Sequence, residues 1–239
     1  IKIRISNLMN KKLIYQFSST KTEGDKSMLD LLGGKGANLA EMSTLGINVP
    51  PGFTVTTEVC NYFIENKSFP DKFDSELEKA LDNLEKIKKK KFNDHKKPLL
   101  LSVRSGGKVS MPGMMDSILN IGINDKNVDA LASNFNDERF ALDSYRRLIQ
   151  MYGNVVLEIE MDRFEAIIDN KKRIDGVEND NDFDSEQLSW IIDAFKTTVE
   201  RFYGNPFPQD PVIQLKGAIE AVFKSWLNKR AVAYRKINN

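Results

Sequence analysis

The sequence predicts an α+β protein, and three observations carry this prediction. Short apolar runs bounded by turn residues, which are typical of strands, lie in the first half of the chain. Apolar residues at helical spacing dominate residues 125–204 instead. The chain has 239 residues, of which 41% are apolar, so it is long enough to bury roughly 70 to 75% of the surface that its unfolded form exposes. Strands confined to the first half of a chain whose second half is nearly all helical favour the α+β class.

Three strands are expected in the first half, at residues 13–17, 53–56 and 99–104. The second follows a Pro-Pro-Gly turn at residues 50–52, and the third is a continuous apolar run of the kind found in buried strands. The third strand ends in a loop that contains two adjacent glycines.

Two helices are expected between these strands. One follows the glycine run at residues 33–36 and stops at Gly46. The other runs from Asp74 to about Lys90, where four apolar residues recur at helical spacing: Leu77, Leu81, Leu84 and Ile87. The lysines at residues 88–91 suit the negative pole of that helix, so we interpret them as a solvated helix end rather than a nucleic-acid patch.

The second half of the chain is expected to be helical. One apolar set consists of Phe140, Tyr145, Leu148, Ile149 and Tyr152, and a second of Leu188, Ile191, Ile192, Phe195, Val199 and Phe202. The second helix is expected to begin at Asp184 or Ser185 and to stop at Gly204. The polar residues 171–184 before it indicate a surface loop, and a last helix with apolar residues from Leu215 to Trp226 follows a proline cluster.

The charge balance limits the partners of the protein. Lys and Arg total 35 and Asp and Glu total 34, which gives a net charge of +1. That charge produces no long-range field that would collect nucleic acid. No apolar run approaches the ~20 residues that a membrane helix needs. We therefore expect a soluble protein with neither nucleic acid nor a membrane as partner.

Cys60 is the only cysteine and His95 the only histidine. Cys60 has no partner for an internal disulfide and no secretory signal opens the chain, so a cytoplasmic location is expected. The chain begins at Ile1 rather than Met, which leaves open an organellar targeting segment before it. One cysteine and one histidine are too few for a typical zinc site, and a catalytic triad would have to use His95, which lies in a polar stretch and is interpreted as a loop residue.

The glycine run at residues 33–36 is the first candidate for chemistry. It matches neither the P-loop template nor the dinucleotide fingerprint. Gly33, Gly34 and Gly36 would nonetheless leave backbone N–H groups unobstructed at a helix start, where Lys35 adds a positive charge, and this combination suits a polyphosphate. A glycine turn with a merely solvated Lys35 is the alternative.

The loop after the third strand is the second candidate. Arg104 offers a planar fork for phosphate oxygens, and Ser105, Gly106 and Gly107 add a hydroxyl and flexible backbone amides. The following Met-Pro-Gly-Met-Met stretch at residues 111–115 is suited to cover such a ligand, since Gly113 allows close backbone approach. The alternative for this stretch is a hydrophobic turn packed on the core.

Several segments of the chain, in order, resemble the N-terminal nucleotide-binding region of the pyruvate phosphate dikinase family. They include LLGGKGANLAEM at residues 31–42, PGFTVTT at 51–57, SVRSG at 102–106 and SMPGMMDSILN at 110–120. The similarity continues at residues 143–147, 149–152, 221–226 and 230–235, so it covers most of the chain.

The resemblance implies the first lobe of an ATP-grasp type domain with an inserted all-helical subdomain. It divides the chain into the lobe at residues 1–124, the helical insert at 125–204 and a helix at 205–239 that returns to the lobe. ATP is the implied ligand. On the matching positions, Lys35 and Arg104 would be the catalytic residues that contact its phosphates. The nucleotide would also be bound by Gly33, Gly34, Gly36, Ser105, Gly106, Gly113, Met114 and Met115. Lys108 stands where the family commonly has arginine, so a role for a second arginine in this loop is in doubt.

The resemblance also implies an activity for the complete enzyme. ATP and phosphate would react with a histidine to give AMP, pyrophosphate and phosphohistidine, and the phosphoryl group would pass to pyruvate and make phosphoenolpyruvate. The second lobe, the phosphohistidine domain and the pyruvate-binding barrel would follow residue 235, and His95 does not match the phosphohistidine motif. Mg²⁺ is expected to bind outside this chain, although Asp116 is a weak candidate ligand, and the full-length enzyme is expected to be a homodimer. We expect the 239-residue chain alone to be inactive and to bind ATP weakly.

Two alternatives stay open. A related dikinase, phosphoenolpyruvate synthase or glucan water dikinase, would share the Gly-Lys-Gly and Val-Arg-Ser elements, although the Met-Pro-Gly-Met-Met-Asp stretch favours the pyruvate phosphate enzyme. The second alternative is a noncatalytic nucleotide-binding or protein-interaction module.

Overall fold

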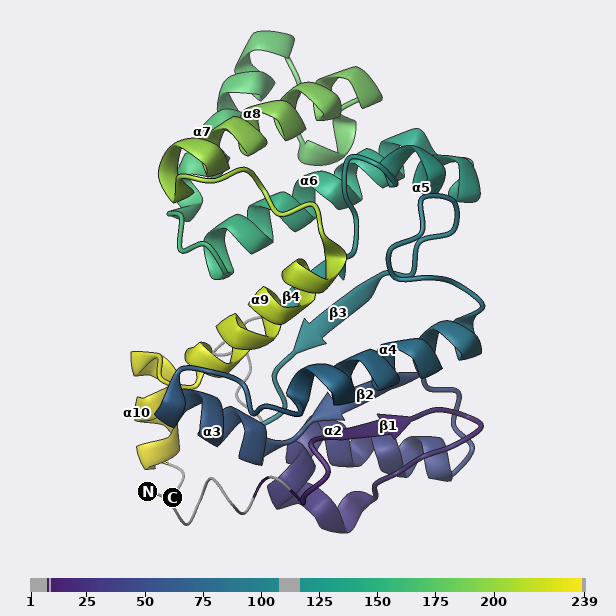
Figure 1. Ribbon diagram of the computed structural model, residues 1–239. Helices are drawn as coiled ribbons and strands as arrows, with labels where there is room; N and C mark the ends of the chain where they lie inside the picture. Colours follow the sequence, from purple (N-terminus) through teal and green to yellow (C-terminus); the bar gives the residue numbers. More distant parts are fainter. Residues whose placement is uncertain (1–7, 9, 108–116, 238–239) are drawn as a thin grey trace. The chain divides into compact units, whose positions relative to one another are not determined.

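The computed structural model describes residues 8, 10–107 and 117–237 (Figure 1). The chain divides into two compact units. Unit 1 consists of residues 1–89, 104–115 and 222–239, and unit 2 of residues 90–103 and 116–221. The division falls at the end of strand β3 (Leu101–Arg104) and within helix α9 (Pro211–Ser225).

Unit 1 is built around a two-stranded antiparallel sheet. Strand β1 (Ile14–Phe17) pairs with β2 (Gly52–Val55), with Ile14 opposite Val55 and Phe17 opposite Gly52. Helix α2 (Leu29–Thr44) contacts both strands, and α4 (Phe73–Lys88) contacts β1. Figure 1 draws the sheet between these two helices. A two-stranded sheet is marginal by itself, so this helical cover is what stabilises it.

Carboxylates occupy the edge of β1 that faces away from β2. Glu76 accepts hydrogen bonds from Leu13 N at 2.8 Å and Ile14 N at 3.1 Å. Glu23 accepts from Gln16 N at 3.0 Å, and its own amide donates to Gln16 O at 2.9 Å. Backbone groups at a free strand edge invite pairing with another chain, and here side chains satisfy several of them.

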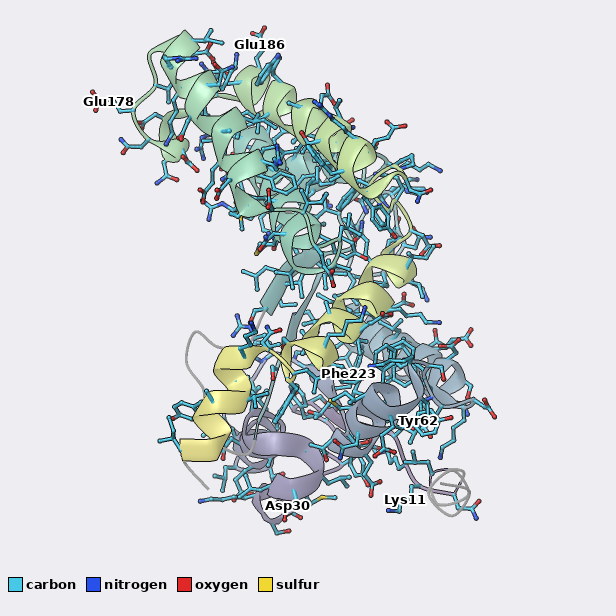
Figure 2. The ribbon with its side chains drawn as sticks, turned by 90° about the vertical axis from the view of Figure 1, so that its left-hand side faces the viewer. Lys11, Asp30, Tyr62, Glu178, Glu186 and Phe223 are labelled. Atoms are coloured by element: carbon cyan, nitrogen blue, oxygen red, sulfur yellow. The ribbon has the colours of Figure 1, made fainter. Side chains whose placement is uncertain are left out.

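An aromatic cluster forms part of the core of unit 1. Phe69 stacks on Phe73 with ring centroids 4.3 Å apart and lies 4.9 Å from Phe63. Phe63 belongs to α3 (Thr57–Asn66) and lies 5.8 Å from Phe223 of α9. Figure 2 labels Phe223 on α9 and Tyr62 on α3. Unit 1 also contains the short helix η1 (Lys26–Met28) and α10 (Lys229–Ile237).

Unit 2 consists of a small sheet and a set of helices. Strand β3 pairs with β4 (Ser117–Ile121). The helices are α5 (Val128–Phe135), α6 (Glu138–Val155), α7 (Met161–Asp175), η2 (Asp180–Asp182) and α8 (Ser185–Tyr203), followed by most of α9. Helix α6 contacts β4, α5, α7 and α8. Its Tyr145, Leu148, Ile149 and Tyr152 are each at most 2% exposed, so α6 is the centre of this unit.

The ends of α8 confirm the residues predicted from the sequence. The Asp184 side chain accepts a hydrogen bond from Gln187 N at 2.8 Å, and the Asp184 amide donates one to the Gln187 side chain. This reciprocal pair satisfies backbone groups at the start of the helix. Gly204 ends the helix with a φ of 82°, a left-handed conformation that glycine adopts without penalty.

The α+β class is confirmed: the protein is mostly helical, with small sheets. Three details differ from the expectations. Helix α7 extends to Asp175, so the loop predicted for residues 171–184 starts only at Gly176. Helix α3 and strand β4 were not predicted. Phe140, expected in an apolar set, is 45% exposed and packs on Phe135. The division at residues 124 and 204 stays a prediction.

Candidate phosphate site

The glycine run at residues 33–36 lies at a kink in α2. Gly33 has φ 67° and ψ 169°, which interrupts the helix, and helical geometry resumes from Gly34 to Thr44. A helical segment does start at the glycines, as expected; a preceding helical turn at residues 29–32, which α2 also includes, was not predicted. The kink creates a second helical segment whose positive end lies at Gly34 and Lys35, where an anion is favoured.

The structure brings the two predicted segments together within unit 1. The amide of Gly34 donates a hydrogen bond to Gly107 O at 2.9 Å. The Lys35 ammonium donates to Ser105 O at 2.5 Å, across a separation of 70 residues in the chain. Both contacts use main-chain carbonyls of the loop that follows β3. The glycine run and the Arg104 loop therefore form one site.

Glycine is required where these two segments touch. A Cβ added at Gly33 would lie 1.6 Å from Gly106 O, and a Cβ at Gly106 would lie 3.2 Å from the Cβ of Lys35. On its other side, Gly36 approaches β2: a Cβ there would lie 2.7 Å from Thr54 Cγ2. The sequence analysis did not identify Thr54 as a neighbour of the site, and no local pattern marks it, because this contact depends on the packing of α2 on the sheet.

The site is electropositive. Lys35 and Arg104 are both exposed, and neither forms a salt bridge with any residue of the ranges that the structure describes. Ser105 is 3% exposed, and its hydroxyl has no hydrogen-bond partner among the described residues. A buried hydroxyl without a partner is uncommon, since leaving it unpaired costs free energy. Two uncompensated cations beside glycine backbone suit a multiply charged anion.

Several predicted residues lie outside the described ranges: Gly113, Met114 and Met115 of the site, together with Lys108 and Asp116. No three His, Cys, Asp or Glu side chains gather into a possible metal site in the part of the chain that is described. No helix in those same ranges has the length and apolar character to cross a membrane.

The histidine and the cysteine belong to other elements than the glycine run and the Arg104 loop. His95 is exposed in a segment of unit 2 between α4 and β3. Cys60 is buried in α3, and burial raises the pKa of its thiol to about 12 from an ordinary 9.0. A thiol with that pKa stays protonated near neutral pH, and only the thiolate is a good nucleophile. Cys60 is therefore a core residue.

Comparisons with known proteins agree with the resemblance found in the sequence. A family model described as "Pyruvate phosphate dikinase, AMP/ATP-binding domain" matches residues 29–93 and 64–239. A protein of Rickettsia conorii (strain ATCC VR-613 / Malish 7) named "Pyruvate, phosphate dikinase" is 52% identical over 230 residues, which are 96% of this chain and 26% of that protein.

Two further relatives extend this similarity. The protein of the same name from Rhizobium meliloti (strain 1021) is 46% identical over 228 residues, 95% of this chain and 25% of that protein. "Pyruvate, phosphate dikinase 1, chloroplastic" of Oryza sativa subsp. japonica is 47% identical over 229 residues, 95% of this chain and 24% of that protein. The chain thus spans about a quarter of the length of these curated relatives.

Proposed function

The chain belongs to the pyruvate phosphate dikinase family and corresponds to its AMP/ATP-binding domain, and we propose that it binds the phosphates of ATP at the site formed by α2 and the loop after β3. The observation that carries this proposal is the meeting of Gly34 and Lys35 with residues 105–107. Two segments that are far apart in the chain meet there, and each carries an exposed cation, Lys35 or Arg104, next to glycine residues.

Each residue has a distinct part in this proposal. Lys35 and Arg104 neutralise the charge of the polyphosphate, the first as a point charge on a flexible stem and the second as a planar fork that binds two oxygens. Gly33, Gly34, Gly36 and Gly106 contribute backbone to the site. Glycine at positions 33 and 36 lets its segments pack closely, because a Cβ at either would lie within 3 Å of a neighbouring atom. Ser105, Gly113, Met114 and Met115 complete the nucleotide site by their positions in the family pattern.

Phosphoryl transfer depends mainly on positioning and on the neutralisation of developing negative charge. Lys35 and Arg104 supply both of these functions, so they are the proposed catalytic residues of this chain. A bound Mg²⁺ would add further neutralisation of the phosphates. We propose that its ligands belong to other parts of the enzyme.

In a protein as long as the relatives, we propose the reaction of ATP, phosphate and pyruvate to AMP, pyrophosphate and phosphoenolpyruvate through a phosphohistidine. This chain would form the first lobe of an ATP-grasp type domain with unit 2 containing the helical insert. The phosphorylated histidine would be another residue than His95, which is remote from Lys35 in the chain and does not match the motif. Pyruvate would meet only the other parts of the enzyme.

The test is ATP binding to the 239-residue chain, measured by calorimetry with and without Mg²⁺. We expect weak binding, and a loss of affinity of roughly tenfold for Lys35→Ala and for Arg104→Ala, since each removes a charge-assisted hydrogen bond. Lys79→Ala is a matched control: Lys79 is an exposed lysine of α4 in the same unit, and its removal should leave affinity unchanged. Tight binding of MgATP that neither site variant alters would contradict the proposed site.

A further inference from the structure

Two donors of the proposed phosphate site already make hydrogen bonds within the chain itself. The amide of Gly34 donates its hydrogen bond to Gly107 O at 2.9 Å. An amide has a single hydrogen, so it cannot make a full hydrogen bond to a phosphate oxygen at the same time. The Lys35 ammonium, which has three hydrogens, uses one of them on Ser105 O at 2.5 Å.

The acceptors in these contacts are chemically similar to the expected ligand. Carbonyl oxygens carry partial negative charge and accept hydrogen bonds, as phosphate oxygens do more strongly. Ser105 O and Gly107 O therefore satisfy the site in the way that two oxygens of a polyphosphate would. The fit is close, because Gly106 O lies where any side chain at position 33 would place its Cβ, at 1.6 Å.

We propose that residues 105–107 act as an internal competitor of the nucleotide: their carbonyls hold Gly34 and Lys35 in a closed state, and polyphosphate binds fully only after this segment has moved away. This inference rests on the proposed function and concerns the regulation of the same site. The apparent affinity for ATP is then the intrinsic affinity reduced by the fraction of molecules in which the segment is open.

The segment is suited to such movement. Its contacts with α2 are main-chain hydrogen bonds and the flexible Lys35 side chain. Two adjacent glycines, Gly106 and Gly107, give the backbone conformations that a bulkier pair would forbid. Gly107 O is held by the Gly34 amide and Ser105 O by the Lys35 side chain, so opening the segment breaks these two hydrogen bonds.

The experiment uses Gly106→Ala in the 239-residue chain. The added Cβ would lie 3.2 Å from Lys35 Cβ, which is tighter than ordinary packing, and 3.5 Å from Lys35 N, which is an ordinary contact. It therefore pushes residues 105–107 away from α2 while every donor of the site remains. We expect ATP to bind roughly 3- to 10-fold more tightly than to the unchanged chain, by population of the open state. Gly204→Ala, at a glycine of unit 2 with open space around it, should leave the affinity unchanged.

A second measurement tests the closed state without ATP. Hydrogen exchange of the Gly34 amide should be slow in the unliganded chain and faster in Gly106→Ala. Fast exchange in the unliganded chain would overturn the proposal, because the closed state would not persist. Unchanged or weaker ATP binding by Gly106→Ala, with its Gly34 amide exchanging faster, would overturn it as well.

Failure of the proposed function is distinguishable from failure of this inference. If the unchanged chain binds no ATP, or if Lys35→Ala binds it equally well, the proposed phosphate site itself is wrong. If Lys35→Ala weakens binding while Gly106→Ala fails to strengthen it, the site stands and the internal competitor is rejected.

Discussion

The proposed phosphate site of unit 1 and the helical core of unit 2 satisfy their polar groups in different ways. In unit 2, buried side chains do this. Gln214 is fully buried in α9, accepts a hydrogen bond from Gly122 N at 2.9 Å, and donates to Ile123 O at 3.0 Å and Pro208 O at 2.8 Å. In the phosphate site the backbone carries the contacts, while Lys35 and Arg104 are exposed and without a carboxylate partner in the described ranges.

This difference separates residues that stabilise from residues that bind. A buried polar group whose donors and acceptors are all used inside the protein has nothing left for a ligand, and its removal damages the fold. An exposed cation without an ion pair contributes little to stability and remains available. Substitutions in unit 2 should therefore lower the free energy of unfolding, and substitutions of the cations in the site should lower affinity for ATP.

The sharpest test of this comparison uses two adjacent arginines that bind one carboxylate. Arg146, whose side chain is 4% exposed, donates to Asp143 Oδ1 at 2.7 Å and to Gln150 Oε1 at 3.0 Å. Arg147, which is 52% exposed, donates to Asp143 Oδ2 at 2.8 Å. Arg146→Ala leaves the half-buried Asp143 with only its exposed partner, so we expect a loss of about 3–5 kcal/mol of unfolding free energy. Arg147→Ala should cost less than about 1 kcal/mol.

Urea denaturation at neutral pH measures both variants. Arg146 also lies 3.7 Å from Asp180. Burial alone would raise the pKa of Asp180, but the hydrogen bond from Lys172 and the charge of Arg146 lower it overall. Equal losses of unfolding free energy for Arg146→Ala and Arg147→Ala would show that burial of an arginine does not determine how much its ion pair stabilises the protein. The contrast drawn between the two units would then be wrong.

The sequence predicted the helical unit better than the phosphate site for a local reason. The ends of α8 depend on Asp184, Gln187 and Gly204, which act on backbone groups within a few residues. The chemistry of the site was also visible, because glycine runs and cations are recognisable by type. The sequence did not predict that the two segments contact each other. Gly34 and Gly107 meet through the packing of segments that are far apart in the chain, and hydrophobic periodicity does not report such contacts.

The errors follow the same rule. The helical turn at residues 29–32 was not predicted, because a glycine run indicates the break at Gly33 but not that a helix also lies before it. Helix α3 was missed because it is short and holds β-branched and aromatic residues, such as Val59 and Phe63, that local propensity assigns to strands. Packing of Phe63 in the aromatic cluster overrides that preference.

A second test compares two glycines with positive φ, one in each unit. Gly204 has φ 82° and nothing within 4 Å of an added Cβ, so Gly204→Ala should cost only about 1 kcal/mol of backbone strain. Gly33 has φ 67° with ψ 169°, a region used almost only by glycine, and its added Cβ would collide with Gly106 O. We expect Gly33→Ala to cost about 2–4 kcal/mol.

Thermal or urea unfolding of the two variants gives the comparison directly. Only Gly33→Ala should also speed hydrogen exchange of the Gly34 amide, because the collision separates the two segments of the site. A Gly33→Ala chain as stable as Gly204→Ala would mean that the contact with residues 105–107 contributes nothing to unit 1.

The smallest effect is expected where unit 1 uses a side-chain network of its own, at Glu23 beside β1. Burial alone would raise the pKa of Glu23, but hydrogen bonds from Lys12, Gln16 N and Lys21 lower it from 4.5 to about 2. A carboxyl whose pKa is lower in the folded state stabilises the protein above its unfolded pKa, and this contribution is lost as the pH falls from about 4.5 to about 2.

Glu23→Gln keeps an acceptor for Gln16 N but no charge, so the unfolding free energy of this variant should decrease less than that of the unchanged chain between pH 7 and pH 3. Urea midpoints at the two pH values measure this. Identical decreases in the unfolding free energy of the two chains would show that the lysines do not stabilise the Glu23 carboxylate.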